Sequence, residues 1–247
     1  FDEATIVNLT VCAPGGPQGE RTPAVASLLD LAPTLLSFAG LSDAEIGERF
    51  PHLKGRNLKP VVLDPQQDGP RGSADAPGDG ALICWDGLNF LDKYWALSGA
   101  LQALSDMTLD PSSAQVDKQA QMLEAGKKYG APDFSKRNYY RAVVDGQYKL
   151  VRWFSPLEYG NPSSLDDLYA HSDVTLHDLV NDPGEMENLA HADHPDHNPA
   201  LVERMLAKLH ALILHEIGDD GAPFDLDMFG TREVTYRTDR SSKSGVD

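Results

Sequence analysis

The sequence predicts an α/β fold in which the end of a larger sheet domain precedes a smaller antiparallel sheet packed against a long helix. Three observations predict it. Residues 1–63 contain a strand followed by a helix, which is one α/β unit. Two β-rich runs flank Asp145-Gly146, a dipeptide suited to a two-residue type I′ turn, and this pattern is typical of a β-hairpin. After Pro199, apolar residues recur at helical spacing, which indicates a long helix with one buried face.

The N-terminal unit begins with a predicted strand over residues 6–13, which a Pro-Gly-Gly sequence ends. Because this strand is apolar on both faces, it is typical of a parallel sheet covered by helices on both sides. Asp30 is the expected N-cap of the next helix, with Pro33 in its first turn and Gly40 after its last. One strand cannot supply such a sheet. Residues 1–63 are therefore expected to be the C-terminal remnant of an α/β domain whose other strands lie outside this chain.

A segment rich in Pro, Gly and Asp, residues 64–80, divides the chain. Its composition cannot bury enough apolar surface to order it, so we expect a linker there. Residues 81–218 are expected to form a C-terminal α+β subdomain, and residues 219–247 a trailing extension with a polar end. Besides the hairpin, the expected elements of the subdomain are a strand at 81–90, helical stretches at 102–107 and 114–125, and a strand at 174–179.

Two further helices are expected after the hairpin. In HDLVNDPGEMENLAHADH, Asp182 is a candidate N-cap, with Pro183 at the first helical position and Glu185 three residues after the cap. The final helix is expected to begin at Pro199 and to stop at Gly218. It has an apolar stripe that should face the antiparallel sheet. The stripe consists of Leu201, Met205, Leu209, Leu212 and Ile213.

Charge and hydropathy exclude several classes of partner. The chain has 21 Lys and Arg against 38 Asp and Glu, a formal net charge of −17. This charge, with no basic stripe, disfavours binding to nucleic acid or to an anionic membrane surface. No apolar run approaches the roughly 20 residues that a membrane-spanning helix needs. Cys12 and Cys84 lie in apolar strand-like runs, so both are expected to be buried free thiols.

Five segments, taken together and in order, carry a family pattern. FDEATIVNLTVCAPGG has an acidic turn and a following strand, and ASLLDLAPTLLSFAGL contains the helix motif DLAPTLL. LKGRNLKPVV, GQYKLVRWFSP and HDLVNDPGEMENLA follow at later positions. Each segment alone is weak, but the five cover most of residues 1–218. Their combination resembles the C-terminal part of formylglycine-dependent sulfatases, which implies the α/β fold of the alkaline-phosphatase-like superfamily.

The catalytic chemistry that this resemblance implies lies outside the chain. Family members use a Cys or Ser that is oxidised to formylglycine in a C/S-x-P-x-R motif, a calcium ion, and a Lys just before the acidic turn. Here Cys12 is followed by Ala-Pro-Gly and Cys84 by Trp-Asp-Gly, so neither fits the motif. The hydrated aldehyde and the cation perform the reaction. The chain alone is therefore expected to be inactive, with formylglycine and calcium in a missing N-terminal half.

The resemblance also implies partners: the chain's own N-terminal catalytic half and a small organic sulfate ester, with a homo-oligomer as a further option. Two alternatives stay open. One is a phosphonate or phosphate monoester hydrolase of the same superfamily. The other is a non-catalytic sulfatase-like module that binds a partner through an exposed sheet face. No residue of this chain is assigned a catalytic or metal-binding role.

Three basic residues are candidates for the rim of the substrate site. Lys136, Arg137 and Arg141 precede or begin the first strand of the hairpin. Their positive charge would favour an anionic sulfate ester. The alternative interpretation is that they are solvated or paired with nearby acidic side chains.

Two other groups have simpler interpretations. Three histidines alternate with aspartates in HADHPDHNP, and folded into a turn they would suit a transition metal. They are His191, His194 and His197. The prolines around them favour a polar connector between two helices. Trp85, Tyr94 and Trp95 would suit a pocket for the apolar group of an organic sulfate, but buried packing is their simpler role.

Overall fold

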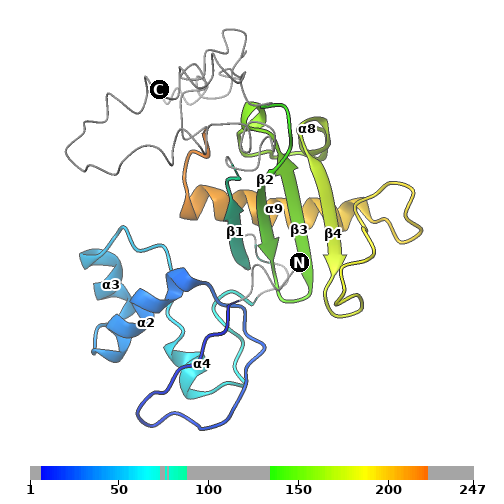
Figure 1. Cartoon of the computed structure of the whole chain (residues 1–247). Coiled ribbons are helices and arrows are strands. Elements are labelled where there is room, and N and C mark those ends of the chain that lie inside the picture. The colour runs from blue at the N-terminus through cyan, green and yellow to red at the C-terminus, as the bar shows by residue number, and fades with distance from the viewer. Residues whose placement is uncertain (1–6, 73–75, 77, 88–133, 222–247) are drawn as a thin grey trace, which may run out of the picture.

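The computed structural model describes residues 7–72, 76, 78–87 and 134–221. The N-terminal part contains η1 (Leu28–Asp30), α2 (Leu31–Phe38), α3 (Asp43–Arg49) and α4 (Lys59–Leu63). The C-terminal part contains β1 (Ala81–Trp85), β2 (Tyr139–Val144), β3 (Tyr148–Phe154), η4 (Pro156–Glu158), α8 (Leu165–His171), β4 (Asp173–Asp178) and α9 (Pro199–Glu216). In Figure 1, α2, α3 and α4 gather beside the β1 edge of a sheet, and α9 crosses one face of that sheet.

The four strands form one antiparallel sheet in the order β1-β2-β3-β4. Val143, Leu150 and Leu176 are opposite one another across β2, β3 and β4. Directly opposed residues share a face of a sheet, and these three belong to the core cluster that α9 completes. The structure therefore confirms a mixed α/β chain in which an antiparallel sheet packs against a long helix.

The β2–β3 hairpin is confirmed, but its turn differs from the expected type I′ turn. The Asp145 N–H donates to the Tyr148 carbonyl (3.1 Å), so Gly146 and Gln147 are the central residues. Of these two, only Gly146 has a positive φ, 100°. This is the pattern of a type II′ turn. The Asp145 carboxylate accepts the N–H groups of Gln147 (3.2 Å) and Tyr148 (2.8 Å), which holds Asp145 at the first position of the turn.

The final helix has the predicted boundaries. Asn198 caps α9 by accepting the N–H groups of Ala200 (3.1 Å) and Leu201 (3.3 Å), and Pro199 occupies the first helical position. Gly218 ends it with a φ of 88°, which glycine adopts without strain. Of the predicted stripe, four residues are fully buried and Leu201 is half-buried. Val202 and Leu206 are also buried and widen this face beyond the predicted stripe.

The N-terminal helix begins earlier than predicted. Ser27, not Asp30, is the cap: its side chain accepts from the Leu29 N–H, and the Asp30 carboxylate accepts the Ser27 N–H (2.9 Å). Together these contacts form a capping box around η1, which leads directly into α2. The Asp30 side chain caps no helix N–H of α2. It is instead buried among partners that lie far away in the sequence.

The strand predicted over residues 6–13 does not form within its described part, residues 7–13. Val7, Leu9 and Val11 are 59%, 44% and 44% exposed. A strand requires a neighbouring strand to pair its backbone groups, and the sheet of the described chain consists of β1 to β4 alone. Within the described residues, the predicted apolar segment therefore belongs to no sheet.

The short helix expected after Asp182 is also absent, and a turn replaces it. Asp182 accepts the N–H of Glu187 (2.8 Å), five residues on. Glu185 has a φ of 54°, outside the helical region, and its carboxylate lies 2.5 Å from the ammonium of Lys149. Lys149 is 3% exposed on β3, and an unpaired buried charge is costly. The ion pair with this lysine therefore outweighs continuation of a helix.

The two cysteines are free, as expected, but both are exposed rather than buried. Cys12 lies in the N-terminal segment at residues 7–13, and Cys84 lies in β1 at the edge of the sheet. In the described part of the chain, no helix has the length and apolar character needed to cross a membrane. The helices expected at 102–107 and 114–125 fall outside the described residues, as does most of the extension at 219–247.

Candidate functional site

The three predicted rim residues do not form one cluster. Lys136 is exposed before β2. Arg137 is half-buried and donates two hydrogen bonds to Glu158 (3.1 and 3.0 Å) and one to Asp173 (2.7 Å). Arg141 is 3% exposed and lies within the sheet. Both arginines are therefore paired with acidic side chains.

Arg141 is held by two carboxylates that come from distant parts of the chain. Its Nε and Nη2 donate to the two oxygens of Asp220 (3.0 and 2.8 Å), which is the bidentate geometry that suits a guanidinium. Its Nη1 donates to Asp86 (2.7 Å). Burial alone would lower the pKa of Arg141, but the hydrogen bonds to Asp220 and Asp86 raise it. The Asp86 side chain is 42% exposed and that of Asp220 is 3% exposed, so Nη1 has the more exposed of the two carboxylate partners.

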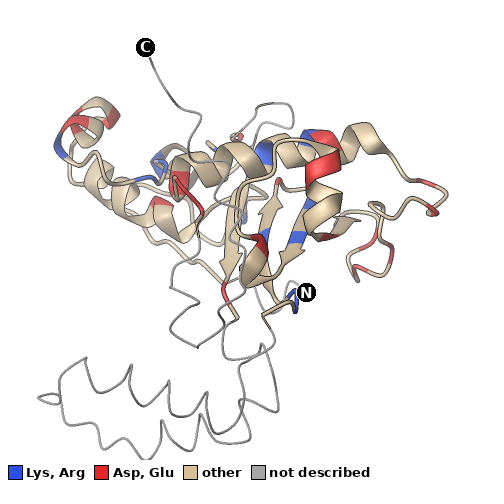
Figure 2. Cartoon of the chain, turned by 90° about the horizontal axis from the view of Figure 1, so that it is seen from above, with Lys and Arg blue, Asp and Glu red and all other residues tan. Residues whose placement is uncertain are grey.

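Arg152 lies directly opposite Arg141 in the register of β2 and β3. It is 2% exposed and donates to the Ser172 hydroxyl (2.8 Å), the Glu158 carbonyl (2.7 Å) and the Gly160 carbonyl. Among the described residues no carboxylate forms an ion pair with it. Burial lowers the pKa of Arg152 to about 10, and the charge of Arg141 also lowers it, against the opposing effect of Asp220. Figure 2 shows basic positions both within the strands and on helices, and acidic positions on helices and loops.

Aromatic rings surround the two arginines on the same sheet face. The guanidinium carbon of Arg141 lies 5.3 Å from the centroid of the Phe154 ring, and that of Arg152 lies 4.3 Å from it. The Tyr159 ring is 5.1 Å from Phe154 and 5.6 Å from Tyr139. Stacking of this kind stabilises a desolvated guanidinium by about 2 kcal/mol or more. The Tyr139 hydroxyl is buried with no hydrogen-bond partner, and burial raises its pKa.

This arrangement binds charge but contains no activated nucleophile. Cys84 is opposite Arg141 in the register of β1 and β2. Although the residue is exposed as a whole, desolvation of its thiol raises the pKa to about 11, against the opposing effect of Arg141. A thiol with that pKa is protonated at neutral pH, whereas a nucleophilic cysteine needs a lowered pKa. The Cys84 thiol is therefore not activated as a nucleophile by the neighbouring Arg141.

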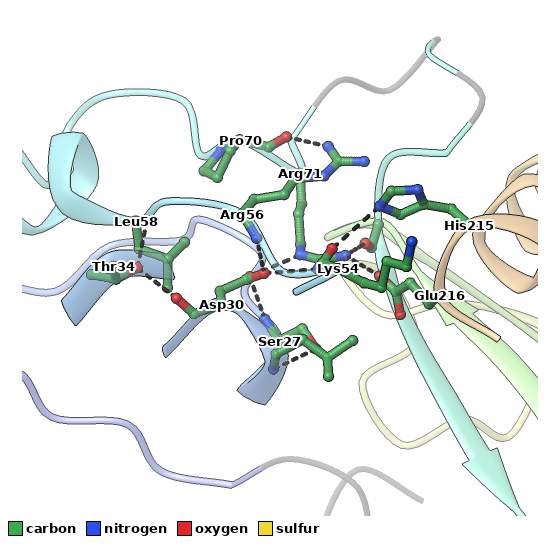
Figure 3. A network of polar contacts seen from close by, with 12 residues as sticks. Ser27, Asp30, Thr34, Lys54, Arg56, Leu58, Pro70, Arg71, His215 and Glu216 are labelled. Atoms are coloured by element: carbon green, nitrogen blue, oxygen red, sulfur yellow. Dashed lines mark hydrogen bonds and ion pairs between the residues drawn. The ribbon is translucent and has the colours of Figure 1, made fainter. Parts of the chain in front are cut away.

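A second polar network joins the N-terminal helices to the end of α9 (Figure 3). Arg71 is fully buried and donates to both oxygens of Asp30 (2.8 and 2.8 Å), to Glu216 (2.8 Å) and to the Gly80 carbonyl (2.9 Å). Asp30 also accepts the backbone N–H of Arg56 (2.7 Å). Arg71 lies within the predicted linker, and its composition gave no signal for this role. The network ties three distant segments together.

The three histidines of the predicted connector have separate partners. His194 lies 3.1 Å from a Glu187 oxygen, His197 lies 2.9 Å from the Leu189 carbonyl, and His191 is exposed. Within the described ranges, no group of three or more His, Cys, Asp or Glu is arranged to hold a metal ion. The structure therefore does not bring these histidines together.

Trp85 is the one described member of the predicted aromatic pocket, since Tyr94 and Trp95 fall outside the described residues. It is 47% exposed, so the expectation that it is buried is wrong. Its ring stacks on Tyr140, which in turn contacts Trp153, with centroids 6.5 and 4.8 Å apart. These rings form a row across β1, β2 and β3 on the face opposite Arg141, because residues alternate between faces.

Comparisons of this chain with protein-family profiles, with curated proteins and with solved structures found no match.

Proposed function

We propose that this chain is the C-terminal part of a hydrolase of sulfate esters and supplies the scaffold for a catalytic half that carries the nucleophile and calcium. The five sequence segments and their order support the proposal. In the described structure, a mixed α/β chain with an antiparallel sheet packed on a long helix agrees with it at a coarser level. The alkaline-phosphatase-like fold is part of the proposal.

The observation that carries the proposal is the row of exposed apolar side chains at Val7, Leu9 and Val11. These residues are every second one in the sequence, which is the spacing of residues on one face of a strand. The segment leads into η1 and α2, which the buried network around Asp30 fixes in place. An exposed apolar segment that belongs to no sheet of the described residues has the properties of a strand that joins a sheet from another part of the protein.

In this proposal Arg141 is a positioning residue for substrate. Its Nη1 is the only edge whose partner, Asp86, is substantially exposed. An incoming sulfate ester would compete with Asp86 for that edge, since guanidinium groups bind planar and tetrahedral oxyanions through pairs of N–H groups. Asp220 would hold the other edge in place.

The test begins with the coding sequence upstream of Phe1. The proposal requires a Lys within a few positions of Phe1 and a C/S-x-P-x-R motif far upstream. The protein made from the whole reading frame, with its formylglycine formed, is expected to hydrolyse 4-nitrophenyl sulfate. The present chain alone is expected to show no turnover above a buffer control, because it lacks the nucleophile.

A matched pair of variants tests the apolar row. In the whole protein, Leu9→Asp should lower the melting temperature and the yield of folded enzyme, because it places a charge on a buried strand. Gln18→Asp changes an exposed polar position in the loop that follows this segment and should change neither. Equal effects of the two variants would contradict the inference that this segment joins a sheet of the catalytic half.

Other outcomes redirect the proposal. Turnover of aryl sulfate by the isolated chain would contradict it. A preference of the whole protein for 4-nitrophenyl phosphate or a phenylphosphonate ester would favour the phosphate or phosphonate hydrolase. An upstream sequence without the motif would leave a non-catalytic module.

A further inference from the structure

A cavity of about 460 Å³ lies where the β2–β3 turn meets the first turns of α9. Asp145, Gln147 and Tyr148 line it from the turn. Asn198, Ala200, Leu201 and Arg204 line it from the helix. Its volume falls in the range of sites that hold small molecules, roughly 300–1,000 Å³.

Arg204 is the cavity's unpaired cation. Its guanidinium carbon lies 5.5 Å from the centroid of the Tyr148 ring, so the ring supports the group from one side. Its Nε is buried and has no hydrogen-bond acceptor. Among the residues that the structure describes, no carboxylate lies within ion-pair distance of it. An oxyanion in the cavity would give this guanidinium the counter-charge that it lacks among the described residues.

The acidic group of the cavity does not oppose an anion. The Asp145 side chain is 3% exposed, and its Oδ2 lies 3.5 Å from the ammonium of Lys208, which is 1% exposed. Its other oxygen accepts the N–H groups of Gln147 and Tyr148. The pair of Asp145 and Lys208 has no net charge, so Arg204 gives the cavity a positive balance. The first turn of α9 adds a favourable field, since helix N-termini attract negative charge.

The other residues that line the cavity determine which chemical group can be attached to the anion. Ala200 and Leu201 present apolar surface, and Gln147 and Asn198 present amide groups. A cavity this large exceeds an inorganic anion and has room for a small organic body. We propose that it binds a small organic oxyanion, with the anionic head on Arg204 and the body against Ala200 and Leu201. This inference is independent of the proposed hydrolase, because it needs neither nucleophile nor calcium.

Titration of the intact chain tests the site, with benzoate as the organic oxyanion, inorganic sulfate as a head without a body, and benzamide as a body without charge. The readout is the set of arginine Nε–Hε resonances, followed by nuclear magnetic resonance. Benzoate is expected to shift one resonance saturably, and Arg204→Gln should remove that resonance. Binding to sulfate and to benzamide should be weaker.

The expected change in benzoate affinity of the Arg204 variant is compared with that of a matched control variant. Arg204→Gln should weaken benzoate binding about 10- to 100-fold, the loss of one charge-assisted hydrogen-bonding group. Arg49→Gln, at an exposed arginine of α3, should leave the affinity unchanged. Benzoate binding that is equal in the two variants, or absent at millimolar benzoate in the wild-type chain, would overturn the site. Equal affinity for sulfate and benzoate would overturn the role of the apolar wall.

A second pair of variants keeps the test valid if Arg204→Gln fails to fold. Ala200→Phe fills the cavity from an exposed position of α9 and leaves the buried face of the helix unchanged. Ala207→Phe adds the same ring at an exposed position that does not line the cavity. Only the first should weaken benzoate binding. Equal effects of the two would contradict the assignment.

Discussion

Replacing Arg71 by methionine is expected to destabilise the chain by about 3–5 kcal/mol, because the change breaks a buried ion pair and leaves its partners without compensation. The side chains of Arg71 and Asp30 are fully buried and that of Glu216 is 4% exposed. Arg71 donates four hydrogen bonds of 2.8–2.9 Å within this group. Methionine keeps the volume of the aliphatic part of the arginine side chain but removes all four hydrogen bonds. The loss is large compared with the 5–15 kcal/mol that holds a typical domain folded.

Urea unfolding followed by circular dichroism measures this change, with Arg49→Met as the matched control. Arg49 is exposed on α3 and its replacement should cost no more than about 0.5 kcal/mol. Adding Asp30→Asn to Arg71→Met should recover part of the loss, since one of the two unpaired charges is then removed. If Arg71→Met and Arg49→Met had equal midpoints and slopes, the buried network would not hold the N-terminal helices to α9, and the reasoning would be refuted.

Two further predictions concern stability. Leu209→Ala should cost about 2–5 kcal/mol because Leu209 is fully buried in the core, whereas Glu203→Ala, at an exposed position of the same helix, should stay within about 0.5 kcal/mol of wild type. Equal effects in denaturant melts would mean that α9 is not packed by this face. Burial alone would raise the pKa of Glu158, but hydrogen bonds from Arg137 and Ser155 outweigh it and lower the pKa. A lowered pKa gives stability above the unfolded value of about 4.3 that is lost as the pH falls through the folded value. The stability difference between wild type and Glu158→Gln should therefore be present at pH 7 and shrink below about pH 4, and a difference that is constant with pH would contradict the pairing.

Much of the C-terminal fold was predictable from the sequence. The turn dipeptide at Asp145 and Gly146 located the hairpin, because only a few residues adopt the backbone of a tight turn. The stripe along α9 predicted its buried face, since residues three and four apart share one side of a helix. Pro199 and Gly218 set its ends for equally local reasons. Each signal is contained within a few adjacent residues.

The candidate sites were less accessible to this reasoning. Arg141 was identified as a cation, but its carboxylates at Asp86 and Asp220 lie 55 and 79 residues away in the sequence. Arg152 and Arg204 were not identified from the sequence. No neighbouring residue shows that Arg152 lies beside another arginine, and none shows that Arg204 lies beside a cavity. A side chain's partners across the fold leave no local pattern. Only the packed structure brings them together.

The sequence by itself determined the antiparallel sheet, the hairpin and the long helix, because turn chemistry and apolar periodicity act over short distances. The tertiary structure alone decided where polar groups find their partners. Asp30 had the sequence of an N-cap, yet it pairs with Arg71, 41 residues away, which in turn reaches Glu216, 145 residues further on. The sequence around Glu185 predicted a helix, yet this residue adopts a positive φ and forms an ion pair with Lys149. A buried charge must be paired wherever the fold places it, and that requirement is stronger than a local preference for helix or cap.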